Sequence, residues 1–167
     1  IINEIQKSIE EIKKHSSKGN FTKKDKIHLT LLFLGEVDEN RLPTIDKSMN
    51  EISMKAFTLE INKIGKFKRQ GGDIYWLGFK DCPHLQELYK DLYQSLSEKG
   101  FALEERPYTP HVTIGRKVVL NKKRDLESLS REISNLQIEV SEISLIQSHH
   151  VNGRLTYTPI ITKALKG

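Results

Sequence analysis

Cysteine is nearly absent from this chain of 167 residues: Cys82 is the one cysteine, so no disulfide can form within the chain. Long apolar runs are absent too, and none approaches the ~18 residues that a membrane-spanning helix needs. No apolar segment with a cleavage site opens the chain as a secretion signal would. We therefore expect a protein of the reducing cytoplasm that has no membrane partner.

Metal-binding patterns are also missing. Metal sites combine histidine, cysteine or carboxylate ligands at short spacings, and His15, His84, His149 and His150 have no partners at such spacings. We interpret these histidines as surface residues, and we expect neither a metal ion nor another cofactor.

The composition is otherwise that of an ordinary folded protein, with 37% apolar and 29% charged residues. Lysine and arginine exceed aspartate and glutamate, 27 to 22, which gives a net charge of +5. This charge has the sign that a polyanionic substrate requires, but it is common among proteins that bind no nucleic acid. Basic clusters at residues 23–26, 66–69 and 122–124 are either solvated surface or the lining of an anion-binding groove. We expect one monomeric domain over residues 1–167.

Apolar spacing divides the chain into helices and strands. Helical periodicity predicts helices over residues 1–12, 42–52, 85–96 and 126–136, the third of which ends at Gly100. Short apolar or β-branched runs predict strands over residues 27–34, 56–64, 74–79, 111–115, 138–146 and 155–161, with a loop at 16–20 and a turn at 152–153. Each half of the chain therefore runs helix, strand, helix, strand, strand.

This internal repeat predicts the fold class. Short strands and helices that alternate in two similar halves favour an α+β fold, with two pseudo-symmetric lobes, antiparallel sheets around a central cleft and helices outside. The strand at 74–79 precedes the second half, whereas no strand precedes the first helix and the chain begins at Ile1 without methionine. We therefore predict that the natural protein has a further short strand before residue 1.

Both halves contain the same short motif, His-x-Thr followed by an apolar residue. It occurs as His28-Leu29-Thr30-Leu31 and as His111-Val112-Thr113-Ile114, each time on the apolar strand that follows a helix. Alternate residues of a strand point to the same face, so each histidine shares its face with a threonine while apolar residues face the core. A buried polar pair is costly unless it is satisfied. Its recurrence at the same place favours a functional site over two core histidines.

Two imidazoles and two hydroxyls around one small anion suit a phosphate. A neutral imidazole can accept a proton from water while a protonated one donates a proton to a departing ribose oxygen, and the free pKa of about 6.5 lets both forms coexist near neutrality. The hydroxyls of Thr30 and Thr113 can donate to phosphate oxygens and stabilise growing charge. The motif predicts acid–base catalysis by His28 and His111 without a metal.

On these residues the chain resembles the two-histidine phosphoesterase superfamily, and within it the RNA 2′,3′-cyclic phosphodiesterases once called 2′-5′ RNA ligases. Residues 28–35 are similar to the first motif of that family, and residues 106–114 to its second. The resemblance implies that His28 is the proton donor and His111 the proton acceptor.

The resemblance also implies the reaction, which is hydrolysis of RNA 2′,3′-cyclic phosphate ends to 2′-phosphates, with RNA or a related nucleotide as the partner. Where the family usually has an aromatic–arginine pair, this chain has Tyr108-Thr109, and Arg116 is predicted to contact the phosphate instead. Two alternatives stay open. One is a binding module that recognises nucleotides or RNA ends without turnover, and the other is a phosphodiesterase acting on small cyclic nucleotides or 2′-5′ oligonucleotides.

Overall fold

The computed structural model describes residues 2–121, 126–133 and 136–167. The basic cluster at 122–124 and part of the helix expected at 126–136 lie outside these ranges. Within them the chain forms two compact units. The first unit contains Ile1–Thr30, Thr58–Cys82 and Thr109–Ile138, and the second contains Leu31–Phe57, Pro83–Tyr108 and Glu139–Gly167. Each unit therefore combines segments from both halves of the sequence.

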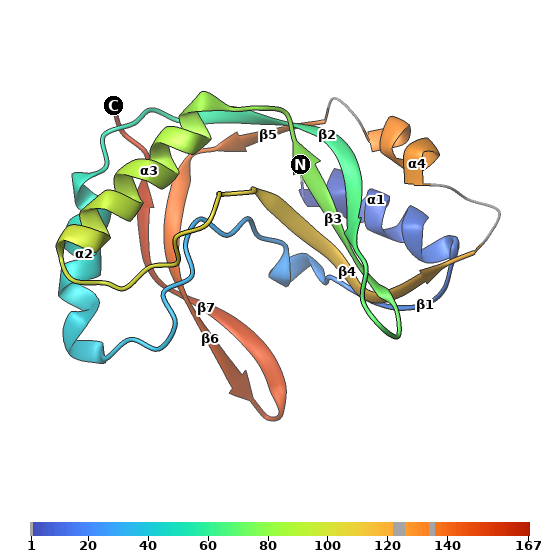
Figure 1. Ribbon diagram of the computed structural model, residues 1–167, viewed down its shortest axis with the longest axis horizontal. Helices are drawn as coiled ribbons and strands as arrows, with labels where there is room; N and C mark the ends of the chain where they lie inside the picture. Colours follow the sequence, from blue (N-terminus) through green and yellow to red (C-terminus); the bar gives the residue numbers. More distant parts are fainter. Residues whose placement is uncertain (1, 122–125, 134–135) are drawn as a thin grey trace. The chain divides into compact units, whose positions relative to one another are not determined.

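The first unit is built on an antiparallel sheet (Figure 1). Its strands lie in the order β1-β4-β3-β2-β5, and the β1–β4, β4–β3 and β3–β2 pairs are antiparallel. The elements are α1 (Ile2–Lys14), β1 (Ser16–Phe21), a short 3-10 turn (Lys24–Lys26), β2 (Phe57–Phe67), β3 (Asp73–Phe79), β4 (His111–Leu120), α4 (Leu126–Ile133) and β5 (Gln137–Val140). The predicted first helix and the strands predicted at 56–64, 74–79 and 111–115 are confirmed, and the last predicted helix is confirmed as far as Ile133.

One face of this sheet packs against α1 and α4. The helical spacing of Ile5, Ile9 and Ile12 puts all three on one side of α1, where each is at most 3% exposed. The buried cluster consists of Ile5, Ile9, Ile12, Ile61, Ile64, Tyr75, Leu77, Val112, Ile114, Val118, Leu129 and Ile133. Because side chains alternate along a strand, the opposite face of β2, β3 and β4 remains for polar and aromatic side chains.

The predictions at 16–20 and 27–34 are wrong. Residues 16–20 form most of β1 rather than a loop, since an edge strand pairs on one side and exposes its polar side chains. Residues 27–34 belong to none of the described strands, and a bend lies at Leu31. The chain passes from the first unit to the second between Thr30 and Leu31, so this apolar run is a connection and not one interior strand.

The second unit contains two helices and a hairpin. Its elements are a 3-10 turn (Glu39–Arg41), α2 (Leu42–Glu51), α3 (Pro83–Glu98), β6 (Glu142–Val151) and β7 (Arg154–Ala164). The strand expected at 138–146 is split between β5 and β6, which belong to different sheets. The turn between β6 and β7 has positive φ at Asn152 and Gly153, 52° and 77°, as a two-residue hairpin requires. Gly100, at φ +92°, follows the end of α3 as predicted.

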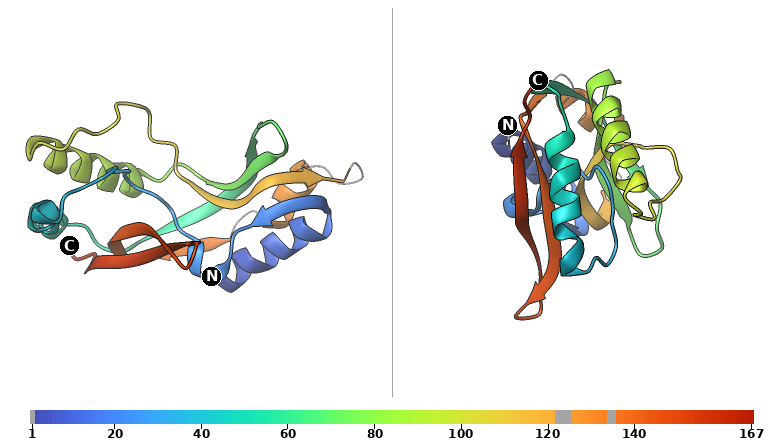
Figure 2. Two further views of the ribbon diagram at one scale, coloured as in Figure 1. Left: turned by 90° about the horizontal axis from the view of Figure 1, so that it is seen from below. Right: turned by 90° about the vertical axis from the view of Figure 1, so that its left-hand side faces the viewer.

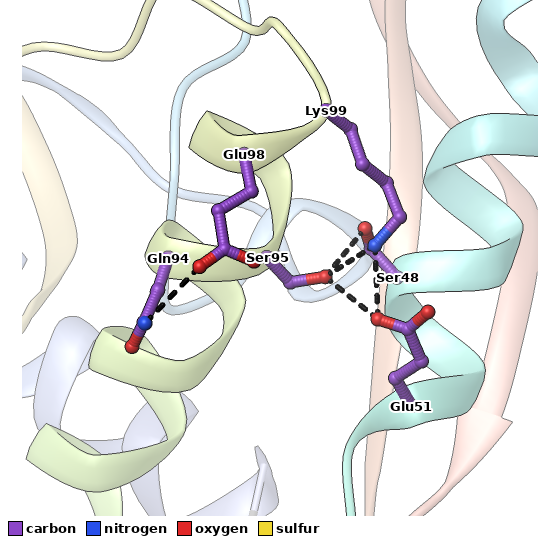
Figure 3. Close-up of polar contacts among 6 residues, drawn as sticks. All are labelled: Ser48, Glu51, Gln94, Ser95, Glu98 and Lys99. Carbon is purple, nitrogen blue, oxygen red and sulfur yellow. Dashed lines mark hydrogen bonds and ion pairs between the residues drawn. The ribbon is translucent and has the colours of Figure 1, made fainter.

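Side-chain contacts hold α2 against its neighbours within this unit. Figure 3 shows the fully buried Ser48 of α2 bonded to Ser95 of α3, 2.8 Å apart, and Lys99 reaching Glu51 at 2.9 Å. The hydrogen bond from Lys99 lowers the pKa of the Glu51 carboxyl. On its other side α2 lies along β7 (Figure 2), where Lys163 pairs with Asp46 at 2.9 Å. Over the described residues, no helix is long and apolar enough to cross a membrane.

Candidate active site

The first motif is held by its apolar neighbours rather than by strand pairing. Ile27 and Leu29 are half-buried and pack against the core of the first unit. His28 and Thr30, which alternate with them, are exposed. The alternation of burial therefore leaves both the histidine and the threonine facing away from the core.

The second motif lies at the start of β4. Val112 and Ile114 are 3% and 1% exposed in the same core, while His111 and Thr113 are half-buried on the opposite face. In the register with β3, His111 lies opposite Gly78 and Thr113 lies opposite Trp76. The burial follows the predicted alternation, and the ladder fixes the backbone of this motif.

Thr22 links the segment that leads to the first motif to the strand that contains the second. Its N–H donates to the carbonyl of Ile114 at 3.0 Å, and its hydroxyl donates to the carbonyl of Thr113 at 2.9 Å. These bonds continue the β1–β4 ladder by one residue. Both motifs are thus anchored within the first unit, one through its neighbours on the core and the other through β4.

The two catalytic candidates make the same local hydrogen bond. The ring Nδ1 of His28 lies 2.7 Å from the carbonyl oxygen of Lys26, and Nδ1 of His111 lies 2.9 Å from that of Thr109. In each case the carbonyl belongs to the residue two positions earlier. Because a carbonyl oxygen can only accept, each ring carries a proton on Nδ1, and the proton that it exchanges in a reaction is the one on Nε2.

Two aromatic rings adjoin His111 on this face of the sheet. The Phe67 ring meets the imidazole edge to face at 5.8 Å between centroids, and the Trp76 ring lies at 6.2 Å with an interplanar angle of 61°. Phe67 and Trp76 are themselves 5.3 Å apart. The sequence pattern assigned neither Trp76, which lies in an apolar strand and was interpreted as core, nor Phe67 to the site. Only the strand register shows that both share a face with His111.

Over the part of the chain that the structure describes, no contact ties the remaining candidate, Arg116, to either motif. Arg116 lies three residues beyond Thr113 on β4, opposite Asn20 of β1, with its side chain exposed. A contact between Arg116 and phosphate therefore stays a prediction. Among the described residues, no group of three or more His, Cys, Asp or Glu side chains is arranged to hold a metal ion.

The other histidines have local partners or lie at the surface. His15 contacts Glu11 at 3.3 Å, and His149 contacts the Thr158 hydroxyl at 2.7 Å. His84 stacks on Phe57 with 5.8 Å between ring centroids, and His150 is exposed. None of these contacts joins them to the two motifs.

Comparison with known proteins identifies the family. The model of the 2′-5′ RNA ligase superfamily matches residues 3–152, and the chain belongs to that superfamily. A Thermotoga maritima protein named RNA 2′,3′-cyclic phosphodiesterase is 35% identical over 65% of this chain, but the match spans 59% of that protein's length. A Methanocaldococcus jannaschii protein of the same name is 31% identical over 87% of this chain and 83% of its own length.

A solved structure agrees with this assignment. Escherichia coli LigT, crystallised in complex with 3′-AMP, superposes with a TM-score of 0.81 and 27% identity over 100% of this chain and 94% of its own. The α+β fold class with antiparallel sheets is therefore confirmed.

Replacing either motif threonine with valine should lower kcat by about 10- to 100-fold, the value of a hydrogen bond to a charged group. Thr30→Val and Thr113→Val each lose the hydroxyl that is predicted to donate to phosphate but keep both histidines. Thr30→Ser and Thr113→Ser keep the hydroxyl and should retain most of the rate in the same steady-state assay. A larger loss in the valine variants than in alanine variants of the histidines would contradict the roles assigned to the two residue types.

Proposed function

We propose that this protein hydrolyses 2′,3′-cyclic phosphate ends of RNA to 2′-phosphates. The observation that supports this most directly is the repeated geometry of the two histidines, each fixed through Nδ1 to the carbonyl two residues before it. Family membership supports the same reaction, because relatives at 30% identity or more are named RNA 2′,3′-cyclic phosphodiesterases.

The mechanism follows from which proton each ring exchanges. Nε2 of neutral His111 accepts a proton from water, and the water oxygen forms a bond to phosphorus. The bond from phosphorus to O3′ breaks, and Nε2–H of protonated His28 gives its proton to O3′. His111 ends protonated and His28 neutral, and proton exchange with solvent restores the starting pair. The assignment of acid and base, and the opening at O3′, come from the family resemblance.

Thr30, Thr113 and Arg116 complete the proposed site by binding phosphate. Each threonine shares the outward side of its motif with a histidine, so its hydroxyl can donate to a phosphate oxygen. Arg116 would add a cation that pairs with the phosphate through its planar guanidinium. Positive net charge over the chain favours the approach of an RNA end.

Two other functions would use the same residues. A phosphodiesterase for small cyclic nucleotides or 2′-5′ oligonucleotides could employ the same acid–base pair, since substrate size does not change the proton transfers. A binding module without turnover would need neither proton transfer, and two fixed histidines on one unit disfavour it. RNA ligation, the reverse reaction, is disfavoured by the high concentration of water.

Activity should survive EDTA and follow a bell-shaped dependence on pH. One imidazole must be neutral and the other protonated in the productive state, so kcat/KM falls on both sides of an optimum. The experiment is incubation of the purified protein with EDTA and an RNA with a 2′,3′-cyclic end, followed by determination of where the phosphate remains. A rate that falls with EDTA and recovers with a divalent ion would show that a metal activates the water.

A further inference from the structure

We propose that Thr22 is a positioning residue that fixes the general acid, His28, relative to the general base, His111. This rests on the proposed function, because the roles of the two histidines are part of that proposal. Thr22 belongs to neither motif, and the sequence pattern does not mark it. Its N–H and its hydroxyl both donate to β4, at the carbonyls of Ile114 and Thr113. Thr22 therefore holds its own segment on the strand that begins with His111.

A short series of hydrogen bonds leads from Thr22 to the ring of His28. Directly after Thr22 the chain enters the 3-10 turn at Lys24–Lys26, in which the N–H of Lys26 donates to the carbonyl of Lys23 at 2.9 Å. The carbonyl of Lys26 in turn accepts the Nδ1 proton of His28 at 2.7 Å. Because the turn fixes the chain between them, a shift of Thr22 moves the Lys26 carbonyl and the imidazole with it.

The acceptor of the Thr22 hydroxyl lies within the second motif. Thr113 shares a face of β4 with His111, and its backbone carbonyl accepts the hydrogen bond from Thr22 at 2.9 Å. The same residue is thus proposed to bind phosphate through its hydroxyl and holds the segment of the other motif through its backbone. Proton transfer requires hydrogen-bond distances at both histidines, so a small displacement of one motif from the other should lower the rate.

Thr22→Val is expected to lower kcat for a 2′,3′-cyclic RNA end by about tenfold, the value of one hydrogen bond of ordinary strength, with little change in KM. Valine has nearly the shape of threonine and keeps the N–H bond to Ile114, but it removes the hydroxyl donor to Thr113. Thr22→Ala also lacks the hydroxyl and should lose at least as much, whereas Thr22→Ser keeps it and should retain most of the rate. Steady-state kinetics of the three purified variants test this. A wild-type rate in the alanine and valine variants would overturn the proposal.

Ser17→Ala provides the matched control for these variants. Ser17 lies on β1 and donates its hydroxyl to the carbonyl of Val119, also on β4, at 3.3 Å. Its replacement removes a side-chain hydrogen bond to the same strand, at a place from which no turn leads directly to a histidine. The rate should therefore stay close to that of the wild type. Equal losses in Ser17→Ala and Thr22→Val would mean that any loosening along β4 slows the reaction, and would overturn the particular role of Thr22.

The dependence on the leaving group distinguishes positioning of the acid from a general structural role. If sulfur replaces O3′ in the substrate, the leaving group departs without a proton, so Thr22→Val should then react almost as fast as the wild type. Adding Thr22→Val to His28→Ala should change kcat by no more than about twofold, because the group that Thr22 positions is already missing. Equal losses on the oxygen and sulfur substrates, or the full loss again in the double variant, would overturn the proposal.

Amide hydrogen exchange tests the anchoring without turnover, so the two proposals can fail separately. Thr22→Val should raise the exchange rate of residues 22–30 about tenfold and leave β3 and β4 unchanged, because only the segment that leads to His28 is released. Faster exchange in a protein that does not hydrolyse cyclic ends would keep the anchoring and overturn the reaction, and with it the role of His28 as acid. Hydrolysis with unchanged exchange and unchanged kcat in Thr22→Val would overturn the role of Thr22 and leave the reaction.

Discussion

Replacing His28 or His111 with alanine is expected to lower kcat for a 2′,3′-cyclic RNA end by about 10²- to 10⁴-fold in each variant, the usual contribution of general acid–base catalysis. Each variant loses a proton transfer at the ring Nε2. His28 is exposed and His111 is half-buried, so neither substitution leaves a large cavity in the core and both variants should stay folded. Steady-state rates and thermal unfolding of the purified variants test this.

His150→Ala provides the matched control for these measurements. His150 is exposed on β6 and belongs to neither motif, so its loss should leave kcat close to the wild-type value. A rate near wild type in His28→Ala or His111→Ala would remove that residue from the mechanism.

A substrate with a better leaving group at the 3′ position is expected to rescue His28→Ala and not His111→Ala. A bridging sulfur in place of O3′ departs without needing a proton, so a missing general acid no longer limits the reaction. The deficit of about 10²- to 10⁴-fold in His28→Ala should then largely disappear, while the missing base still limits His111→Ala. The measurement compares kcat of each variant on the sulfur and oxygen substrates.

Rescue of the other variant would reverse the assignment of acid and base. The comparison is needed because the two limbs of a pH profile belong to the histidine pair as a coupled unit. Rescue of neither variant would mean that protonation of the 3′ oxygen does not limit the rate in His28→Ala.

The orientation of the side chains in the second motif could be predicted from the sequence, because it depends only on the alternation of neighbouring residues. In β4 apolar residues at every second position fill the core, so Val112 and Ile114 by themselves orient His111 and Thr113. The first motif obeys the same alternation, with Leu29 on the core and His28 exposed. Its outward side could be predicted although the strand expected there was wrong.

What the sequence could not supply is the pairing between strands. An apolar run such as residues 27–34 is equally compatible with an interior strand and with a connection that buries a few side chains, because periodicity says nothing about backbone partners. The proximity of Phe67 to His111 depends on the β2–β3 and β3–β4 registers, which join residues far apart in sequence. The position of Gly65 opposite Trp76 likewise depends on the β2–β3 register, which the sequence alone does not predict.

The backbone segments that hold His28 and His111 differ in local stability. The backbone of His111 is part of a ladder in the interior of a sheet, and such ladders open only when much of the surrounding unit unfolds. The backbone of His28 belongs to no described strand and depends on Ile27 and Leu29, whose side chains are half-buried. A small subglobal opening can therefore release His28 while His111 stays in place. Inactivation by mild denaturant should begin at His28, before the sheet is lost.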